Sequence, residues 1–326
     1  MPKQNNANTM AFGEFIALMA VMMSLMALSI DIMLPALGQI GHDMQLGQIN
    51  DTQLLISLLF LGFAIGMIFY GPFSDSYGRK PAIYIGLTIA ILGGALSWVA
   101  TDYNTMLWGR FFQGLGLASV RIVTMSLVRD LYRGDEMGKV MSLIMSIFIL
   151  VPILAPSLGQ VILMFAHWRT IFAFILGLSI LVLIWFTLRQ QETIHKEDRH
   201  PLSITRLMHD VSFMFQNKIV LGYTIMSGLV FAAFLGYLNS SQQLLQEMYH
   251  LGKLFPLYFG LLAIAVGCAS VVNAKWVMRF GMRTMSKYAL QGMVLASIIF
   301  WFVAQHAEGV PALWQLMAYL AIVLFC

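Results

Sequence analysis

The sequence predicts an all-α protein that crosses a membrane many times, and three observations lead to that prediction. Hydrophobic residues make up 59% of the 326 residues and charged residues only 10%, whereas a soluble domain has about 25% charged residues. The mean hydropathy is +0.79. Apolar runs close to the ~20 residues that a helix needs to cross a bilayer recur along the chain. We therefore expect a polytopic membrane protein.

Ten apolar runs are candidate membrane helices. They cover approximately residues 11–37, 52–72, 82–100, 106–127, 139–165, 168–188, 219–243, 255–277, 285–304 and 311–326. The first run is too long for a signal-peptide core and lacks a small-residue cleavage site, so it should be retained. The last run reaches Cys326 without a polar tail. We therefore expect a truncated chain, with two further helices in the complete protein.

The positions of Lys and Arg predict the orientation. Of the 19 such residues, fifteen fall in segments on the side of the N-terminus, two on the opposite side and two inside a span. By the positive-inside rule the N-terminus is cytoplasmic. The polar segment 189–217 is the only sizeable interruption. It predicts an N-terminal bundle of six helices at residues 1–188, a cytoplasmic central loop at 189–217, and a second bundle at 218–326.

Composition and spacing argue against several other functions. The basic residues lie in short loops between spans, so the net charge of +4 does not indicate nucleic-acid binding. The two Cys and seven His residues show no metal-ligand spacing. No phosphate-binding loop and no nucleophile–base pattern is visible. We expect no metal, no cofactor, no ATP-driven step and no enzymatic activity.

Three charged residues within the spans are candidates for transport chemistry. Asp31 is the only acid well inside a span, and an ionised carboxylate there costs a few kcal/mol unless it is paired, neutral or functional. Arg110 lies at a similar depth and is a candidate charge partner of Asp31 or a residue that responds to its protonation state. Arg121 lies eleven residues deeper, ~16 Å along the helix, and should face a central cavity. The alternatives are a structural Asp at the wet end of its helix and, for Arg110, an arginine that extends to the interface.

Two other segments predict mechanical roles. The stretch 71–81 should form a tight hairpin, in which the glycines permit unusual backbone angles. Asp75 with Arg79, and Arg129 with Asp130, would form a charge cluster that holds one conformation; an isolated exposed pair contributes only ~0–1 kcal/mol. In the fifth span the set Pro152, Pro156 and Gly159 should kink the helix or let a neighbour approach closely. The alternative is an ordinary proline kink.

These segments resemble signatures of the major facilitator superfamily. The pattern G-x-x-x-D-R-x-G-R-K/R is matched by Gly71, Asp75, Gly78, Arg79 and Lys80, with Ser76 where Arg is usual. The helix-four pattern R-x-x-Q-G-x-G is matched by Arg110, Gln113, Gly114 and Gly116.

Further matches are similar to the bicyclomycin-resistance (Bcr/CflA) subfamily. Arg129 and Asp130 close the fourth span as that subfamily does, and the segment from Ile30 to Leu37 resembles its helix-one signature. Pro156 and Gly159 agree with the antiporter pattern G-P-x-x-G-G.

The resemblance implies two six-helix bundles, of which the chain covers ten helices. It also implies a monomeric, proton-coupled exporter that moves drugs or other small lipophilic compounds across the bacterial inner membrane by antiport. Asp31 would exchange a proton for the outgoing compound, and the helix-five segment would favour exchange. Two alternatives stay open: export of a specific metabolite or amino acid on the same fold, and an inactive truncated fragment.

Overall fold

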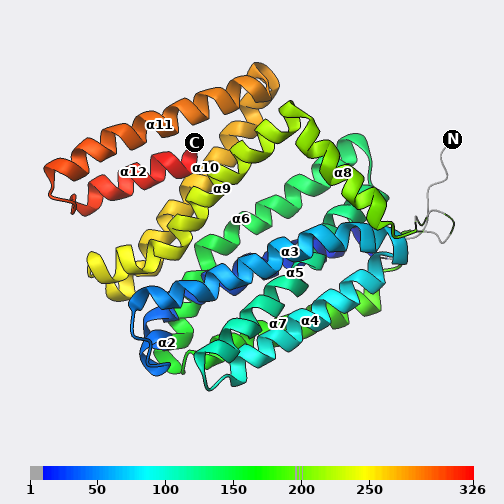
Figure 1. Ribbon diagram of the computed structural model, residues 1–326, viewed down its shortest axis with the longest axis horizontal. Helices are drawn as coiled ribbons and strands as arrows, with labels where there is room; N and C mark the ends of the chain where they lie inside the picture. The colour runs from blue at the N-terminus through cyan, green and yellow to red at the C-terminus, as the bar shows by residue number, and fades with distance from the viewer. Residues whose placement is uncertain (1–9, 195–196, 198, 200) are drawn as a thin grey trace.

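The computed structural model describes residues 10–194, 197, 199 and 201–326, and within that part the regular structure is helical (Figure 1). The first half of the chain contains α1 (Phe12–Asp31), η1 (Leu34–Ala36), α2 (Leu37–Asp43), η2 (Ile49–Gln53), α3 (Leu54–Tyr77), α4 (Arg79–Val99), α5 (Tyr103–Leu131), α6 (Gly134–Phe165) and α7 (Arg169–Arg189). The second half contains α8 (Ile204–Gln216), α9 (Lys218–Gln242), the π-helix η4 (Gln243–Met248), η5 (Gly252–Leu254), α10 (Phe255–Phe280), α11 (Met282–His306) and α12 (Leu313–Phe325).

Nine of the described helical stretches are long and apolar enough to cross a membrane. They correspond to the first nine predicted runs, so the prediction of a polytopic all-α protein is confirmed. The tenth run forms α12, which has 13 residues. At 1.5 Å per residue this helix is ~20 Å long, shorter than the ~30 Å hydrocarbon core of a bilayer.

The polar segment 189–217 contains a helix that the sequence analysis missed. Its α8 carries apolar residues at helical spacing, such as Met208, Val211 and Phe215, between polar ones. Met208 and Phe215 are exposed. The average polarity of the segment concealed this pattern, because an amphipathic helix is recognised by the period of its apolar residues and not by their number.

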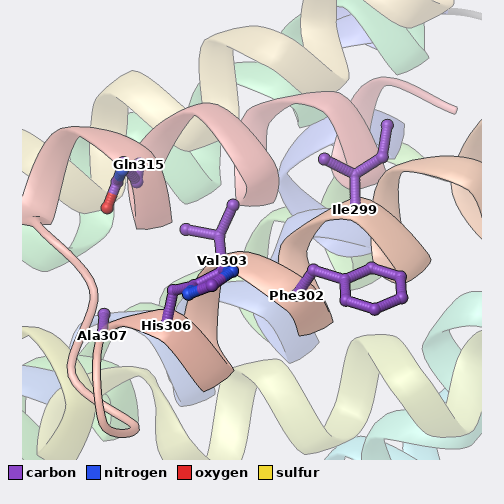
Figure 2. Close-up of a pocket in the computed structure, with 6 residues that line it drawn as sticks. All are labelled: Ile299, Phe302, Val303, His306, Ala307 and Gln315. Carbon is purple, nitrogen blue, oxygen red and sulfur yellow. The ribbon is translucent and has the colours of Figure 1, made fainter.

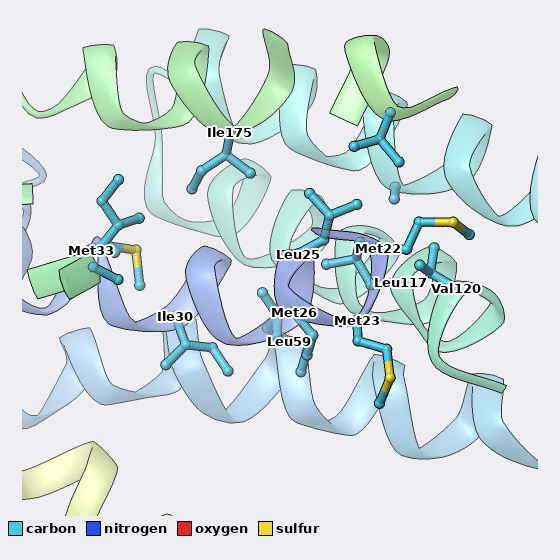
Figure 3. Close-up of a cluster of buried hydrophobic side chains, with 14 of the residues drawn as sticks. Met22, Met23, Leu25, Met26, Ile30, Met33, Leu59, Leu117, Val120 and Ile175 are labelled. Carbon is cyan, nitrogen blue, oxygen red and sulfur yellow. The ribbon is translucent and has the colours of Figure 1, made fainter. Parts of the chain in front are cut away.

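The core of the first half is built around α1, which is the most buried of the candidate spans. Its apolar side chains, among them Met22, Leu25 and Met26, pack against residues of α3, α5 and α7 (Figure 3). Leu59 of α3 and Ile175 of α7 lie on either side of α1 in this view. A helix that is apolar all round can be buried in this way because no face of it needs water.

Glycines allow α5 to lie very close to both α3 and α4. A Cβ at Gly114 would overlap the carbonyl oxygen of Leu59 in α3, and one at Gly116 would overlap that of Gly86 in α4. Gly62 of α3 meets the carbonyl oxygen of Phe111 in the same way. Small residues at these positions give backbone-to-backbone packing, the usual means of associating helices in lipid.

The two halves of the chain meet along α3, α6, α9 and α10. Figure 1 shows α11 and α12 at the edge of the molecule that lies away from α4 and α7. α6 packs against α1 of its own half and against α10 of the other. Gly260 of α10 sits beside the carbonyl oxygen of Ile153 in α6, where a Cβ would lie 3.4 Å from it.

Candidate functional site

Asp31 lies at the end of α1, where α6 packs against that helix. It is the last residue of α1, and only 4% of its surface is exposed. Among the described residues its carboxylate has neither a hydrogen bond nor an ion pair. Gly159 of α6 packs directly on the carbonyl oxygen of Ile32, where any Cβ would overlap that oxygen. The glycine of the helix-five signature thus fixes the backbone next to Asp31.

Tyr237 of α9 brings a phenol from the second half of the chain within electrostatic range of this carboxylate. The Tyr237 ring stacks on Phe259 of α10, with the ring centroids 5.9 Å apart and the planes 11° from parallel. Neither residue was among the predicted site residues, because a single aromatic residue in an apolar run carries no signal of its own.

Arg110 is fully buried and joins three helices. Its guanidinium donates hydrogen bonds to the carbonyl oxygens of Ser29 in α1 (3.0 Å) and Leu55 in α3 (3.3 Å), and to Oε1 of Gln113 (2.7 Å). It also lies 5.7 Å from the ring centroid of Phe172 in α7. Arg110 was a candidate charge partner of Asp31, and the two are not paired in this conformation.

Arg121 is half-buried in α5, on the same helix face as Arg110 and three turns further along. No described residue forms an ion pair or hydrogen bond with its guanidinium. An unpaired cation at this depth remains available to an anion or to an electron-rich oxygen of a bound compound.

The predicted hairpin at 71–81 is almost entirely helical. α3 continues through Gly71 and Pro72 to Tyr77, and α4 begins at Arg79, so that Gly78 alone connects them. Gly78 has φ of +111°, a conformation that favours glycine. The prediction of a special backbone angle is confirmed there, whereas Gly71 is an ordinary helical residue. Its position next to a proline made Gly71 resemble a turn.

The charged residues of this region form what we call the Arg79 cluster: Asp75, Arg79 and Asp130. The Arg79 side chain is 6% exposed; it lies 2.5 Å from Oδ1 of Asp75 and 2.9 Å from Oδ2 of Asp130. Asp130 is therefore the partner of Arg79 and not of its neighbour Arg129, which donates to Ser126 at 3.2 Å. The cluster unites the end of α3, the start of α4 and the end of α5.

Both prolines of the helix-five segment lie inside α6, which runs without interruption from Gly134 to Phe165. Pro152 and Pro156 cannot donate to the carbonyls four residues earlier. Pro152, Pro156 and Gly159 are spaced so that they share one face of α6, and Gly159 on that face packs on the backbone of Ile32.

Polar side chains join the two halves at the end of the molecule opposite the Arg79 cluster. Nε2 of Gln53 donates to Oε1 of Gln243 at 2.7 Å, and Asn239 donates to Ser57 at 3.4 Å. These contacts lie at the start of α3, whose 24 residues separate them from the Arg79 cluster by ~36 Å. We call these four residues the amide latch.

A shallow pocket elsewhere in the molecule lies between α11 and α12 (Figure 2). It is lined by Ile299, Phe302, Val303, His306, Ala307 and Gln315. None of the predicted site residues belongs to it. No group of metal-ligating side chains is found among the described residues.

Comparison with known proteins identifies the family. The family sequence model described as Major Facilitator Superfamily matches residues 10–326. The chain is 30% identical over 284 residues to a bicyclomycin resistance protein homolog of Haemophilus influenzae, covering 85% of this chain and 69% of that protein. It is 27% identical over 220 residues to the multidrug resistance protein MdtL of Vibrio parahaemolyticus, covering 68% of this chain and 54% of that protein.

Solved structures agree in fold. A D-xylose–proton symporter superposes with a TM-score of 0.73 at 14% identity, covering 96% of this chain and 80% of that one. The human organic anion transporter MFSD10 gives 0.67 at 17% identity, covering 98% and 85%. The chain belongs to the Major Facilitator Superfamily as a multi-pass membrane transporter, not an enzyme, and within that family it resembles the bicyclomycin-resistance transporters.

Proposed function

We propose that this protein exports drugs or other small lipophilic compounds in exchange for protons across the bacterial inner membrane. It would do so as a monomer, with its N-terminus and the Arg79 cluster on the cytoplasmic side. The observation that carries the proposal is Asp31, a buried carboxylate without a partner among the described residues, at the end of α1 beside α6.

The environment of Asp31 supports a role in proton exchange. A carboxylate that leaves water must be neutralised by a cation, a metal or a proton. Arg110 does not serve as that cation here, because its donors are directed to backbone oxygens and Gln113. A proton taken up when the site is closed, and released when water reaches it, would couple the movement of the two halves to a proton gradient.

A series of aromatic side chains on α9 also favours an apolar substrate. Phe231, Phe234 and Tyr237 of α9 contact one another in sequence, and Tyr237 continues the series to Phe259. Aromatic faces bind varied lipophilic compounds without demanding one shape, and the 24 methionines of the chain are similarly adaptable. The printed names of the relatives, bicyclomycin resistance and multidrug resistance, agree with such a substrate.

Everted membrane vesicles that contain the protein provide the test. With an imposed pH gradient, bicyclomycin and ethidium serve as probes, and proton release from the vesicles is recorded after each addition. Release with several unrelated lipophilic compounds would support a multidrug antiporter. Release with a single metabolite or amino acid would favour the narrower exporter, and no release with any compound would overturn the proposal.

The amide latch provides a prediction about the transport cycle. Because Gln53–Gln243 and Ser57–Asn239 join the halves at the end opposite the Arg79 cluster, transport should require these contacts to separate. We expect a reversible bifunctional thiol cross-linker between Gln53→Cys and Gln243→Cys to stop transport, and reduction to restore it. Cys268 and Cys326 are exposed and must first be replaced by Ser. Gln53→Cys alone is the control; full transport by the cross-linked pair would contradict the prediction.

A further inference from the structure

Residues 190–194, which follow α7, contact the Arg79 cluster. No sequence motif predicted this contact. Oε1 of Glu192 accepts a hydrogen bond from the backbone N–H of Arg79 at 2.9 Å, and Oε2 accepts one from that of Lys80 at 3.0 Å. These are the first two N–H groups of α4, which have no acceptor within the helix. A carboxylate at this end also interacts favourably with the helix dipole.

Neighbouring residues attach the same segment at two further points. Oγ1 of Thr193 donates to Oδ2 of Asp130 at 2.7 Å, and Nζ of Lys80 donates to the carbonyl oxygen of Gln190 at 2.7 Å. Gly78 leaves room for the Glu192 carboxylate, since a Cβ there would lie 2.6 Å from Oε2. The segment 190–194 therefore contacts both the backbone of Arg79 and one of its two carboxylate partners.

We infer that Glu192 is a positioning residue of the Arg79 cluster. It holds the first turn of α4 where the Arg79 guanidinium reaches Asp75 and Asp130 together. The beginning of the central segment is therefore part of the cytoplasmic gate, by which we mean the contacts of the Arg79 cluster that hold this conformation. The two carboxylates come from different helices, and a small displacement of the Arg79 backbone would lose one of them. The gating role rests on the function proposed above; the positioning role does not.

The first experiment compares Glu192→Gln with the wild type in vesicles, with ethidium as the probe. The amide keeps the shape of the side chain but loses its charge and one acceptor oxygen. We expect the maximal transport rate to fall roughly ten-fold while KM for ethidium stays unchanged, because one strong helix cap is weakened and Asp31 is untouched. Glu197→Gln is the matched control, since Glu197 is exposed and has no ion pair among the described residues. Equal rates in both variants would overturn the inference.

A double-mutant cycle separates positioning from simple capping. If Glu192 acts through Arg79, then Glu192→Gln combined with Asp130→Asn should be no slower than the slower single variant. If the rate losses of the two single variants multiply in the double variant, Glu192 only caps α4. Hydrogen exchange of the Arg79 and Lys80 amides requires no transport and should be faster in Glu192→Gln, with Glu192→Asp in between. Unchanged exchange would refute the positioning role, whereas absent transport in the wild type would refute only the proposed function.

Discussion

Replacing Asp31 by Asn is expected to abolish substrate-induced proton release while leaving substrate binding within about two-fold. Asn has nearly the same shape and can still form hydrogen bonds, but it cannot bind or release a proton at any working pH. The site is buried at the end of α1 beside α6 and has no other acid among the residues named there. If exchange depends on this carboxylate, the mutant retains a binding site without a coupling group. The measurement is ethidium binding to purified protein together with proton release from everted vesicles.

Glu14→Gln is the matched control for this substitution. Glu14 lies at the other end of α1 and is already engaged, with Oε1 and Oε2 each 2.6 Å from Arg189 and with Trp185 donating to Oε1 at 3.2 Å. This variant should keep proton release. Unchanged release in Asp31→Asn would make Asp31 a structural residue and would direct attention to Arg121.

The sequence predicted the membrane helices well, because a bilayer imposes length and apolarity on each span independently of its neighbours. It also predicted the pairing of Asp75 with Arg79, which are one helical turn apart. Such features depend on local spacing and need no knowledge of the tertiary structure.

Contacts between segments that are distant in the sequence could not be predicted from local spacing. Glu192 lies 113 residues from Arg79, and Tyr237 approaches Asp31 from the other half of the chain. Asp130 was predicted to pair with the adjacent Arg129. Packing of α4 against α5 decides instead for Arg79. The helical state of 71–77 was missed for a related reason, since neighbouring helices compensate for a proline in a membrane helix.

Arg110→Leu is expected to lower the free energy of unfolding by about 3 kcal/mol or more. The guanidinium satisfies the carbonyl oxygens of Ser29 and Leu55 and the amide oxygen of Gln113 in a fully buried place. Leucine would remove all three hydrogen bonds and leave the buried amide oxygen of Gln113 without a donor among the described residues, and a buried group left unsatisfied costs about 1–3 kcal/mol. The thermal unfolding midpoint in detergent, and the yield of monodisperse protein, measure the loss.

Two further variants decide whether Arg110 is more than a structural support. Arg121→Leu should change stability little, because Arg121 is half-buried and unpaired among the described residues. A stable Arg121→Leu variant that fails to transport would therefore assign Arg121 to the substrate path.

Arg110→Lys keeps the charge but lacks the planar guanidinium, whose several donors reach α1, α3 and α5 at once. It should recover only part of the stability. If Arg110→Lys is as stable as the wild type yet loses proton release, Arg110 responds to the protonation state of Asp31. If Arg110→Leu is fully stable, the three hydrogen bonds contribute nothing and the structural role is wrong.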